Sequence, residues 1–106
     1  MVQFTVEISG DSMWPTFVSG QQLLFEERAD SSSISVNDVV VARHPLKSGV
    51  VVVKRVKRAE GQSLFLEGDH PDPLASEDSH NFGPVNRSAV LGVWMPTTNG
   101  DSEAKQ

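Results

Sequence analysis

Short segments in which apolar and polar residues alternate, separated by glycine and proline, constrain the fold of this 106-residue chain most. Side chains at every second position of a β-strand point to the same face, so this alternation predicts half-buried strands. The expected strands are residues 2–8, 21–26, 39–43, 50–58, 63–67 and 89–94. No segment has a convincing helical period. The pattern therefore predicts a mainly β fold, either a small barrel-like domain or a folded sheet.

Two of the expected strands are neighbours along the chain. Glu60-Gly61, between residues 50–58 and 63–67, is typical of a hairpin turn, so we expect these two strands to pair antiparallel. A long irregular stretch from Gly68 to Ser88 then precedes the last strand. Loops of this length inside a compact domain are usually functional or disordered.

Length and composition limit the class of protein. A chain of 106 residues fits one domain with a modest core, which we place at residues 1–96, with a polar, disordered tail at 97–106. The net charge of -5 argues against a nucleic-acid partner. The sequence contains no cysteine, which excludes disulfides, thiolate metal sites and cysteine nucleophiles.

The sequence also bears on location. It has no apolar run of the roughly 18 residues that cross a bilayer, and its N-terminus lacks the basic and apolar regions of a secretory signal. The missing cysteines fit a reducing compartment. We therefore expect a cytoplasmic protein without a membrane anchor.

Lys54 lies on the apolar face of the strand expected at residues 50–58. At a period of two it shares that face with Val50, Val52 and Val56. Burial disfavours the charged form of a lysine and lowers its pKa, which makes a neutral amine available as a base. Without a partner for that base, a lysine that extends its ammonium into water would be the ordinary interpretation.

A serine on a tight turn provides that partner. Residues 10–16 read Gly-Asp-Ser-Met-Trp-Pro-Thr directly after the first strand, and Pro15 disfavours helical geometry at the residue before it. A hydroxyl becomes a nucleophile when a neighbouring base can take its proton. Ser12 and Lys54 together therefore predict a serine/lysine peptidase. Met13 and Trp14 either line a substrate pocket or pin the turn to the core.

Ser12-Met13-Trp14-Pro15-Thr16 resembles the Ser-Met-x-Pro-Thr box of the S26-type (type I) signal peptidases. Four further segments resemble boxes of that family in the same order: Asn37-Asp38-Val39-Val40 (Gly-Asp-Val/Ile-Val), Lys54-Arg55-Val56 (Lys-Arg-Val), Gly68-Asp69-His70 (Gly-Asp-Asn) and residues 76–80 (Ser-x-Asp-Ser-Arg). The resemblance spans roughly residues 8–94, so no single box carries it.

The resemblance implies a mostly β catalytic domain and assigns roles to particular residues. Ser12 would be the nucleophile and Lys54 the general base. Ser76 would be a supporting hydroxyl that orients the Lys54 amine, and Asp78 a structural acid of that loop. The backbone N–H of Ser12 would bind part of the oxyanion. We expect Met13 and Trp14 to contact substrate, and we expect neither a cofactor nor a metal.

Three positions depart from the family's pattern. Gly10 stands where many members carry a hydroxyl residue that donates to the oxyanion. His70 replaces an asparagine, and His80 replaces an arginine that would form a salt bridge to an acid such as Asp78. We also expect the protein to lack the membrane anchor that is typical of a signal peptidase.

A short member of this kind is similar to the maturation proteases of nickel-type superoxide dismutase. Those proteases remove an N-terminal extension from the dismutase precursor and expose a new amine that helps to bind nickel. The resemblance therefore implies this precursor as the substrate and partner.

Two other catalytic interpretations remain open. The self-cleaving domains of SOS-type repressors also use a serine and a lysine, and residues 38–43 and 53–56 resemble those domains as well. A serine/histidine/aspartate triad could use one of three histidines: His44, His70 and His80. No histidine has a recognisable triad spacing, and we expect His44 at a surface turn because a proline follows it.

Two alternatives need no peptidase. A loop rich in oxygen and imidazole ligands could hold a metal, although its spacing matches no known cage; its residues are Glu67, Asp69, His70, Asp72, Glu77, Asp78 and His80. Alternatively, a β module could bind a peptide by strand addition without cutting it. Ser12 would then be an ordinary turn residue.

Overall fold

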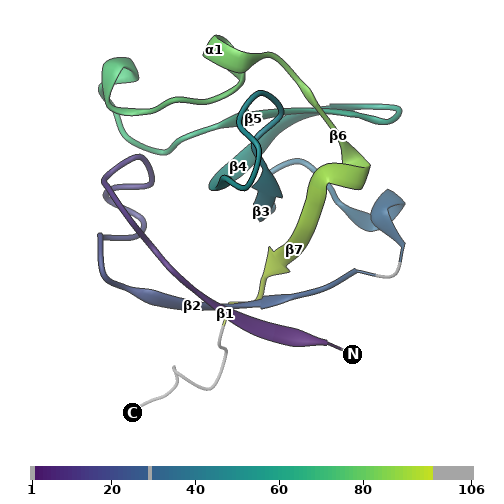
Figure 1. Ribbon diagram of the computed structural model, residues 1–106, viewed down its shortest axis with the longest axis horizontal. Coiled ribbons are helices and arrows are strands. Elements are labelled where there is room, and N and C mark those ends of the chain that lie inside the picture. The colour runs from purple at the N-terminus through teal and green to yellow at the C-terminus, as the bar shows by residue number, and fades with distance from the viewer. Residues whose placement is uncertain (1, 29, 97–106) are drawn as a thin grey trace.

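A computed structural model describes residues 2–28 and 30–96, and within these residues the strands form one seven-stranded antiparallel sheet (Figure 1). The strands lie in the order β1-β2-β7-β3-β4-β5-β6. Their bounds are β1 (Gln3–Glu7), β2 (Gln22–Glu26), β3 (Val39–Arg43), β4 (Val51–Glu60), β5 (Ser63–Glu67), β6 (Val85–Asn86) and β7 (Val90–Trp94). In the part of the chain that the structure describes, helical structure is limited to one turn of α-helix, α1 (Ser79–Phe82), and three 3₁₀ turns: η1 (Ser31–Ser33), η2 (Pro73–Ala75) and η3 (Arg87–Ala89).

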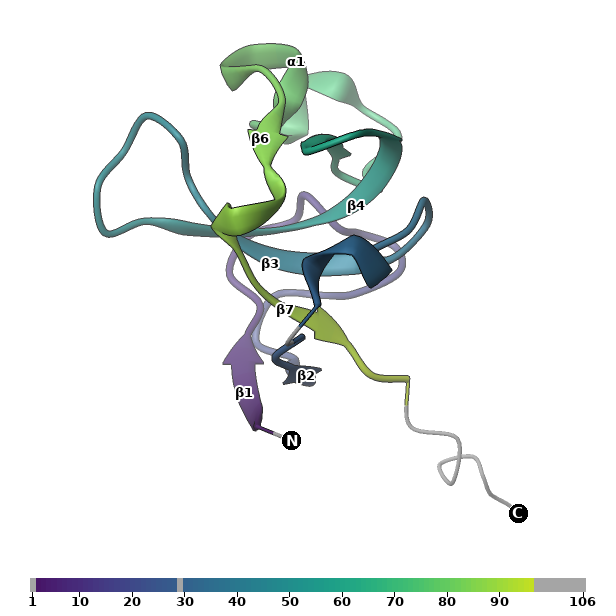
Figure 2. The same ribbon diagram turned by 90° about the vertical axis from the view of Figure 1, so that its right-hand side faces the viewer.

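The predicted mainly β architecture is confirmed as a folded sheet and not as a closed barrel. β1 and β6 lie at opposite ends of the strand order and do not pair with each other. Figures 1 and 2 show β1 and β2 at one end of the molecule, with α1 and β6 at the other. The antiparallel pairing of β4 with β5 is also as predicted.

The stretch from Gly68 to Ser88 is less irregular than the sequence suggested. It contains η2, α1 and the two-residue strand β6, which pairs with β5. Asp72 and Asp78 accept hydrogen bonds from the first turns of η2 and α1, so side-chain caps start both turns. The tail predicted at 97–106 lies outside the described residues.

The central strand β3 is buried on both faces. Val40 and Ala42 belong to one apolar cluster, while Val39 and Val41 belong to a second. Two clusters of this kind form because the sheet folds over on both sides of β3. The other buried members are Ile34, Val56, Leu64, Leu66, Phe82, Val85 and Val93 in the first cluster, and Ile8, Met13, Phe17, Leu23 and Phe25 in the second.

Strand pairing leaves part of β4 without a neighbour on one side. β3 pairs with β4 from Val51 to Arg55, whereas β5 pairs with β4 only from Arg55 onward. Among the described residues, β1 is an edge strand of the sheet and pairs with β2 alone. The outer edge of β1 and the start of β4 are therefore free there to accept further backbone hydrogen bonds.

Candidate active site

Ser12 lies on the turn that follows β1, which we call the serine turn (residues 10–17). Two backbone hydrogen bonds close it, from Trp14 N–H to the Asp11 carbonyl (3.0 Å) and from Phe17 N–H to the Met13 carbonyl (2.9 Å). Gly10 has a φ of +84°, a conformation that glycine adopts without the steric penalty of a side chain. The turn predicted from the sequence is therefore present, and it holds Ser12 at a fixed place beside β4.

Lys54 reaches that serine from β4. Its Nζ lies 2.7 Å from the Ser12 Oγ, although the two residues are 42 positions apart in the chain. The residue is only 4% exposed, and its cross-strand partner on β3 is Val40. The structure thus brings together the two residues that the sequence paired, at the distance of a good hydrogen bond.

Burial lowers the pKa of Lys54 below its ordinary value of 10.5, because an ammonium loses hydration among apolar neighbours. The carboxylates of Asp78 and Glu77 act in the opposite direction and favour the charged form. The environment therefore makes the neutral amine more accessible than in water. A neutral lysine amine can accept the hydroxyl proton of Ser12.

Ser76 is buried but bonds to a different partner from the expected one. Its hydroxyl donates to Asp78 Oδ2 at 3.2 Å. No hydrogen bond joins Ser76 to Lys54 in residues 2–28 and 30–96. Ser76 lines the larger hollow beside the loop and not the groove that Ser12 and Lys54 border. It packs near the serine turn through Gly68, where an added Cβ would lie 2.9 Å from the Ser76 Cβ and 2.6 Å from the Ser12 carbonyl oxygen.

Asp78 organises the loop between β5 and α1 (residues 68–78). It is 5% exposed and accepts hydrogen bonds from the backbone N–H groups of Gly68 (3.1 Å) and His80 (3.0 Å), besides the Ser76 hydroxyl. These bonds hold the loop across the serine turn, to which His70 N–H adds a bond to the Ser12 carbonyl (3.0 Å). This is the geometry of a structural acid.

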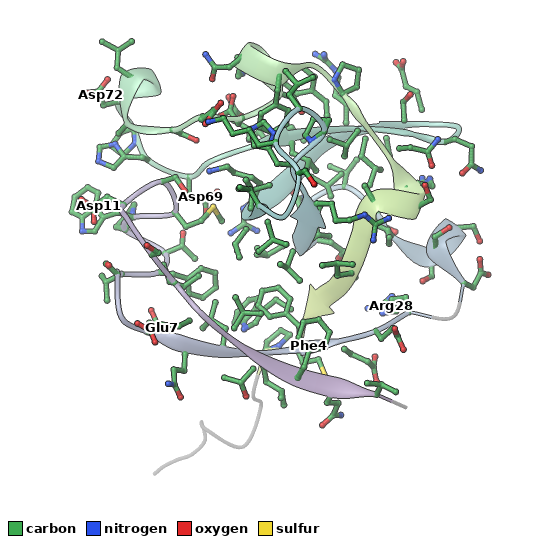
Figure 3. All side chains as sticks on the ribbon, in the orientation of Figure 1. Phe4, Glu7, Asp11, Arg28, Asp69 and Asp72 are labelled. Atoms are coloured by element: carbon green, nitrogen blue, oxygen red, sulfur yellow. The ribbon has the colours of Figure 1, made fainter. Side chains whose placement is uncertain are left out.

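An ion pair that the sequence did not assign joins three of the family-like boxes. Arg55, next to Lys54, forms two hydrogen bonds with Asp69, of 2.9 Å and 2.8 Å. Asp69 also accepts the Thr16 hydroxyl of the serine turn at 2.7 Å, and Figure 3 shows it lying beside that turn. We call these residues the Arg55–Asp69–Thr16 clamp. The available signal was that all three residues lie in family-like boxes: Thr16 with Ser12, Arg55 with Lys54, and Asp69 in the box at residues 68–70.

The two residues beside the nucleophile have different surroundings. Met13 is 1% exposed and belongs to the second apolar cluster, so it pins the serine turn to the core. Trp14 is 45% exposed, and its ring packs against His70 with centroids 5.5 Å apart. Met13 also borders the groove described next, whereas Trp14 does not.

A groove of about 240 Å³ runs along the Ser12–Lys54 pair, between β1 with the segment that follows it and the start of β4. Its lining is mostly apolar: Val6, Glu7, Ile8, Ser9, Ser12, Met13, Val51, Val52, Val53 and Lys54. The groove thus lies between the edge strand β1 and the part of β4 that β5 leaves unpaired. An extended peptide placed there could hydrogen-bond to both strands.

The histidines do not form a triad with Ser12. His70 Nδ1 accepts the Asp72 N–H, and His80 Nε2 lies 2.9 Å from a Glu67 carboxylate oxygen. The expectation that His44 lies at a surface turn was wrong: its side chain is 1% exposed and packs on Phe82. No histidine hydrogen-bonds to Ser12 in the part of the chain that the structure describes.

A larger hollow of about 500 Å³ borders the loop that carries the acidic and histidine residues, but neither Ser12 nor Lys54 lines it. Among the described residues, no group of three or more histidine, aspartate or glutamate side chains could hold a metal ion. Asp69, one of the candidate ligands, bonds instead to Arg55.

Comparison with known proteins agrees with this geometry. Residues 2–82 match the family described as Peptidase S24-like. The chain belongs to this peptidase family. It is 32% identical over 119 residues to the mitochondrial ATP-independent inner membrane protease subunit 1a of Arabidopsis thaliana, covering 87% of this chain and 71% of that protein. It is 31% identical over 112 residues to the mitochondrial inner membrane protease subunit 1 of Xenopus tropicalis, covering 81% of this chain and 66% of that protein.

These matches support a serine peptidase of the S24 and S26 kind, which is the class of enzyme that the sequence resemblance implied. They do not bear on a nickel-type superoxide dismutase precursor. Within residues 2–28 and 30–96, the longest helices fall far short of the length and apolar character that a membrane crossing requires.

Proposed function

We propose that this protein is a serine endopeptidase in which Ser12 is the nucleophile and Lys54 the general base. The observation that carries the proposal is the 2.7 Å contact between the Lys54 Nζ and the Ser12 Oγ, made by a lysine that is 4% exposed. A buried amine beside a hydroxyl on a fixed turn meets the two requirements of a nucleophile–base pair, geometry and an altered pKa.

The reaction would proceed in two stages. Ser12 Oγ bonds to the scissile carbonyl carbon while its proton passes to Lys54 Nζ, and the C–N bond then breaks as that proton moves to the leaving amine. Water next attacks the ester, with Lys54 again taking the proton, and frees Ser12. The Ser12 N–H donates to no acceptor within the described residues, so it is available to the oxyanion.

The groove suggests how a substrate would bind. A peptide strand between β1 and β4 would alternate its side chains, and those facing inward would meet Val6, Ile8 and Met13. Met13 would then contact substrate from the floor of the groove. Trp14 lies outside the groove lining, so a contact with substrate would require a residue that extends beyond it.

We further propose that the reaction removes an N-terminal extension from a precursor protein, with the nickel-type superoxide dismutase precursor as the candidate substrate. The resemblance of residues 10–16 to the maturation proteases supports this choice. We also propose that the protein is cytoplasmic. Cell fractionation with an antibody to the protein tests this location.

The deciding experiment incubates purified protein with the dismutase precursor and maps any new N-terminus by mass spectrometry. We expect wild type to release one new terminus and Ser12→Ala to be slower by roughly 10³-fold or more. Ser63→Ala, at an exposed position of β5, is the matched control and should cleave normally. Equal cleavage by Ser12→Ala would contradict the nucleophile assignment.

The same experiment separates the alternatives. A β module that only binds the peptide would retain the precursor without producing a new terminus. A self-cleaving domain would shorten its own chain and leave the precursor intact. If the protein cuts a different precursor and leaves the dismutase precursor intact, the proposed substrate is wrong. The assignment as a peptidase would still hold.

A further inference from the structure

Glu7 is a charged residue of the groove that the proposed mechanism does not use. It is the last residue of β1, and its side chain is exposed. Among the residues that line the groove, the other charged one is Lys54, which is buried and bonds to Ser12. Figure 3 shows Glu7 on the same side of the molecule as Asp11 of the serine turn. Glu7 is therefore the lining residue that can select for charge in a peptide away from the dyad.

The hydrogen bonds of Ile8 fix the direction in which the backbone of Glu7 points. The Ile8 N–H donates to the Gln21 carbonyl (2.8 Å), and the Ile8 carbonyl accepts the Gly20 N–H (2.7 Å). Both backbone groups of Ile8 thus face the segment that leads into β2. Because neighbouring residues of a strand point their backbone groups to opposite edges, those of Glu7 and Ser9 point to the free edge of β1. A peptide that adds to this edge would pair with Glu7.

The start of β4 presents its backbone to the groove in a matching way. Both backbone groups of Val56 bond to residues 37–38, directly before β3, at 2.8 Å each. At a period of two, the N–H and carbonyl groups of Val51 and Val53 therefore point away from β3. Both residues line the groove, and β5 does not pair with either. A peptide strand in the groove can thus bond to Glu7 on one side and to these two valines on the other.

The side chains of such a peptide would alternate between two environments. Val6 and Ile8 pack into the second apolar cluster, so Glu7 points to the opposite, exposed face of β1. Residues that pair across neighbouring strands share a face, with their Cβ atoms about 4.5–5.5 Å apart. The peptide residue that pairs with Glu7 would therefore lie beside its carboxylate. The two neighbours of that peptide residue would face the apolar floor of the groove, which includes Met13.

The carboxylate of Glu7 is free for a contact with a peptide. In the part of the chain that the structure describes, it forms no ion pair. Its cross-strand partner on β2 is Gln22, which carries no charge. Asp69, by contrast, is already paired with Arg55. Opposite charges that face each other across two strands attract, and like charges repel.

We propose that Glu7 is a specificity-determining residue that favours a lysine or arginine at the substrate position paired with it in the groove. This inference rests on the proposed function and adds a charge preference to the apolar contacts already described. An acidic residue at the same position is disfavoured, because two carboxylates would then face each other. The contact is exposed to solvent, so its effect is modest and added salt weakens it.

The test measures peptide binding to Ser12→Ala protein by fluorescence anisotropy. The probes are short labelled peptides in which serine and valine alternate, as the two faces of the groove require, and in which one central serine is replaced by lysine, glutamine or glutamate. The lysine peptide should bind about two- to fivefold more tightly than the glutamine peptide, and the glutamate peptide more weakly by a similar factor. A lysine in place of a central valine should weaken binding, because that side chain faces the apolar floor.

Variants of Glu7 in the same Ser12→Ala background assign the preference to this residue. Glu7→Gln should remove it, and Glu7→Lys should reverse it in favour of the glutamate peptide. Glu27→Gln is the control for net charge, since Glu27 is exposed, follows β2 and lies outside the groove lining, and it should keep the lysine preference. A lysine preference that survives Glu7→Gln, or one that Glu27→Gln removes equally, would overturn the proposal.

The outcomes for Glu7 and for the proposed function are separate. If the Glu7-dependent preference appears but wild type cuts no peptide, the peptidase assignment fails and Glu7 remains a recognition residue. If wild type cleaves a precursor in a Ser12-dependent way but the three peptides bind equally well, the specificity role alone is wrong. If no peptide binds, the groove is not a peptide site and the inference is wrong.

Discussion

At the scale of single residues, Lys54 combines a poor environment for a charge with a good one for a base. An amine buried among valines is less stable in the fold than an apolar side chain of similar length. Lys54→Met should therefore raise the free energy of unfolding by about 1 kcal/mol and abolish cleavage, the usual exchange between stability and activity at a catalytic site. Urea unfolding and the peptide assay measure the two effects. A less stable Lys54→Met would contradict this account.

The lowered pKa of Lys54 gives its stability effect a definite sign. Between the pKa in the fold and the ordinary value of 10.5, the unfolded chain binds more protons than the folded one. The free energy of unfolding then rises with pH through that window. We expect wild type to show this rise and Lys54→Met to lack it, measured as urea midpoints at several alkaline pH values. Cleavage should rise with pH over the acid side of the same transition.

Gly68 is required by contact and not by backbone angle. A Cβ at this position would lie 2.6 Å from the Ser12 carbonyl oxygen and 2.9 Å from the Ser76 Cβ, which is closer than such atoms normally approach. Gly68→Ala should push the loop from the serine turn, lower stability by roughly 1–3 kcal/mol and reduce kcat. Thermal unfolding and the peptide assay test this. Unchanged kcat in a folded Gly68→Ala protein would contradict a role for the loop contact.

At the scale of elements, the Arg55–Asp69–Thr16 clamp ties β4, the β5–α1 loop and the serine turn together. Asp69→Asn removes the charge from a bidentate, mostly buried pair and should lower the free energy of unfolding by about 1–3 kcal/mol. Thr16→Val removes a single hydroxyl donor and should lower it by about 1 kcal/mol. Because the clamp sets the position of Ser12 against Lys54, both changes should lower kcat more than they raise KM. A rise in KM that exceeds the fall in kcat would instead mean that the clamp acts on substrate binding in the groove.

Elements formed by local patterns were predictable from the sequence, whereas those formed by distant contacts were not. Alternation marked the strands, and a two-residue turn between β4 and β5 fixed their pairing. β7 lies between β2 and β3 in the sheet, and no local sequence pattern indicates that order. His44 was misplaced for the same reason: its burial depends on Phe82 and Glu77, more than 30 positions away.

In the candidate site, too, the local sequence predicted some features and not others. The apolar face of β4 indicated that Lys54 is buried, which depends only on its neighbours in one strand. The contact with Ser12 spans 42 positions, and it was inferred from the need of a buried lysine base for a hydroxyl partner and from the order of the family-like boxes. The bond from Ser76 to Asp78, in place of Lys54, depends on side-chain directions in an irregular loop, which no periodicity encodes.

At the scale of the whole molecule, the folded sheet leaves two strand edges facing one groove. Both edges are unpaired within the described residues, so an extended peptide beside Ser12 could hydrogen-bond to each of them. The open architecture therefore predicts that a bound peptide bridges β1 and the start of β4. Val51 to Val53 and Val6 to Ser9 are the backbone segments that would bond to it.

This arrangement can be tested with Ser12→Ala, which should bind the precursor peptide without cutting it. Hydrogen exchange should slow in two segments far apart in sequence, residues 6–9 and 51–54, because both would gain backbone hydrogen bonds. At a peptide concentration 100 times its Kd, the free energy of unfolding should rise by about 2.7 kcal/mol. Protection confined to one segment would mean that the peptide pairs with a single edge. In that case the fold of the sheet would bring Ser12 to Lys54 without shaping the substrate site.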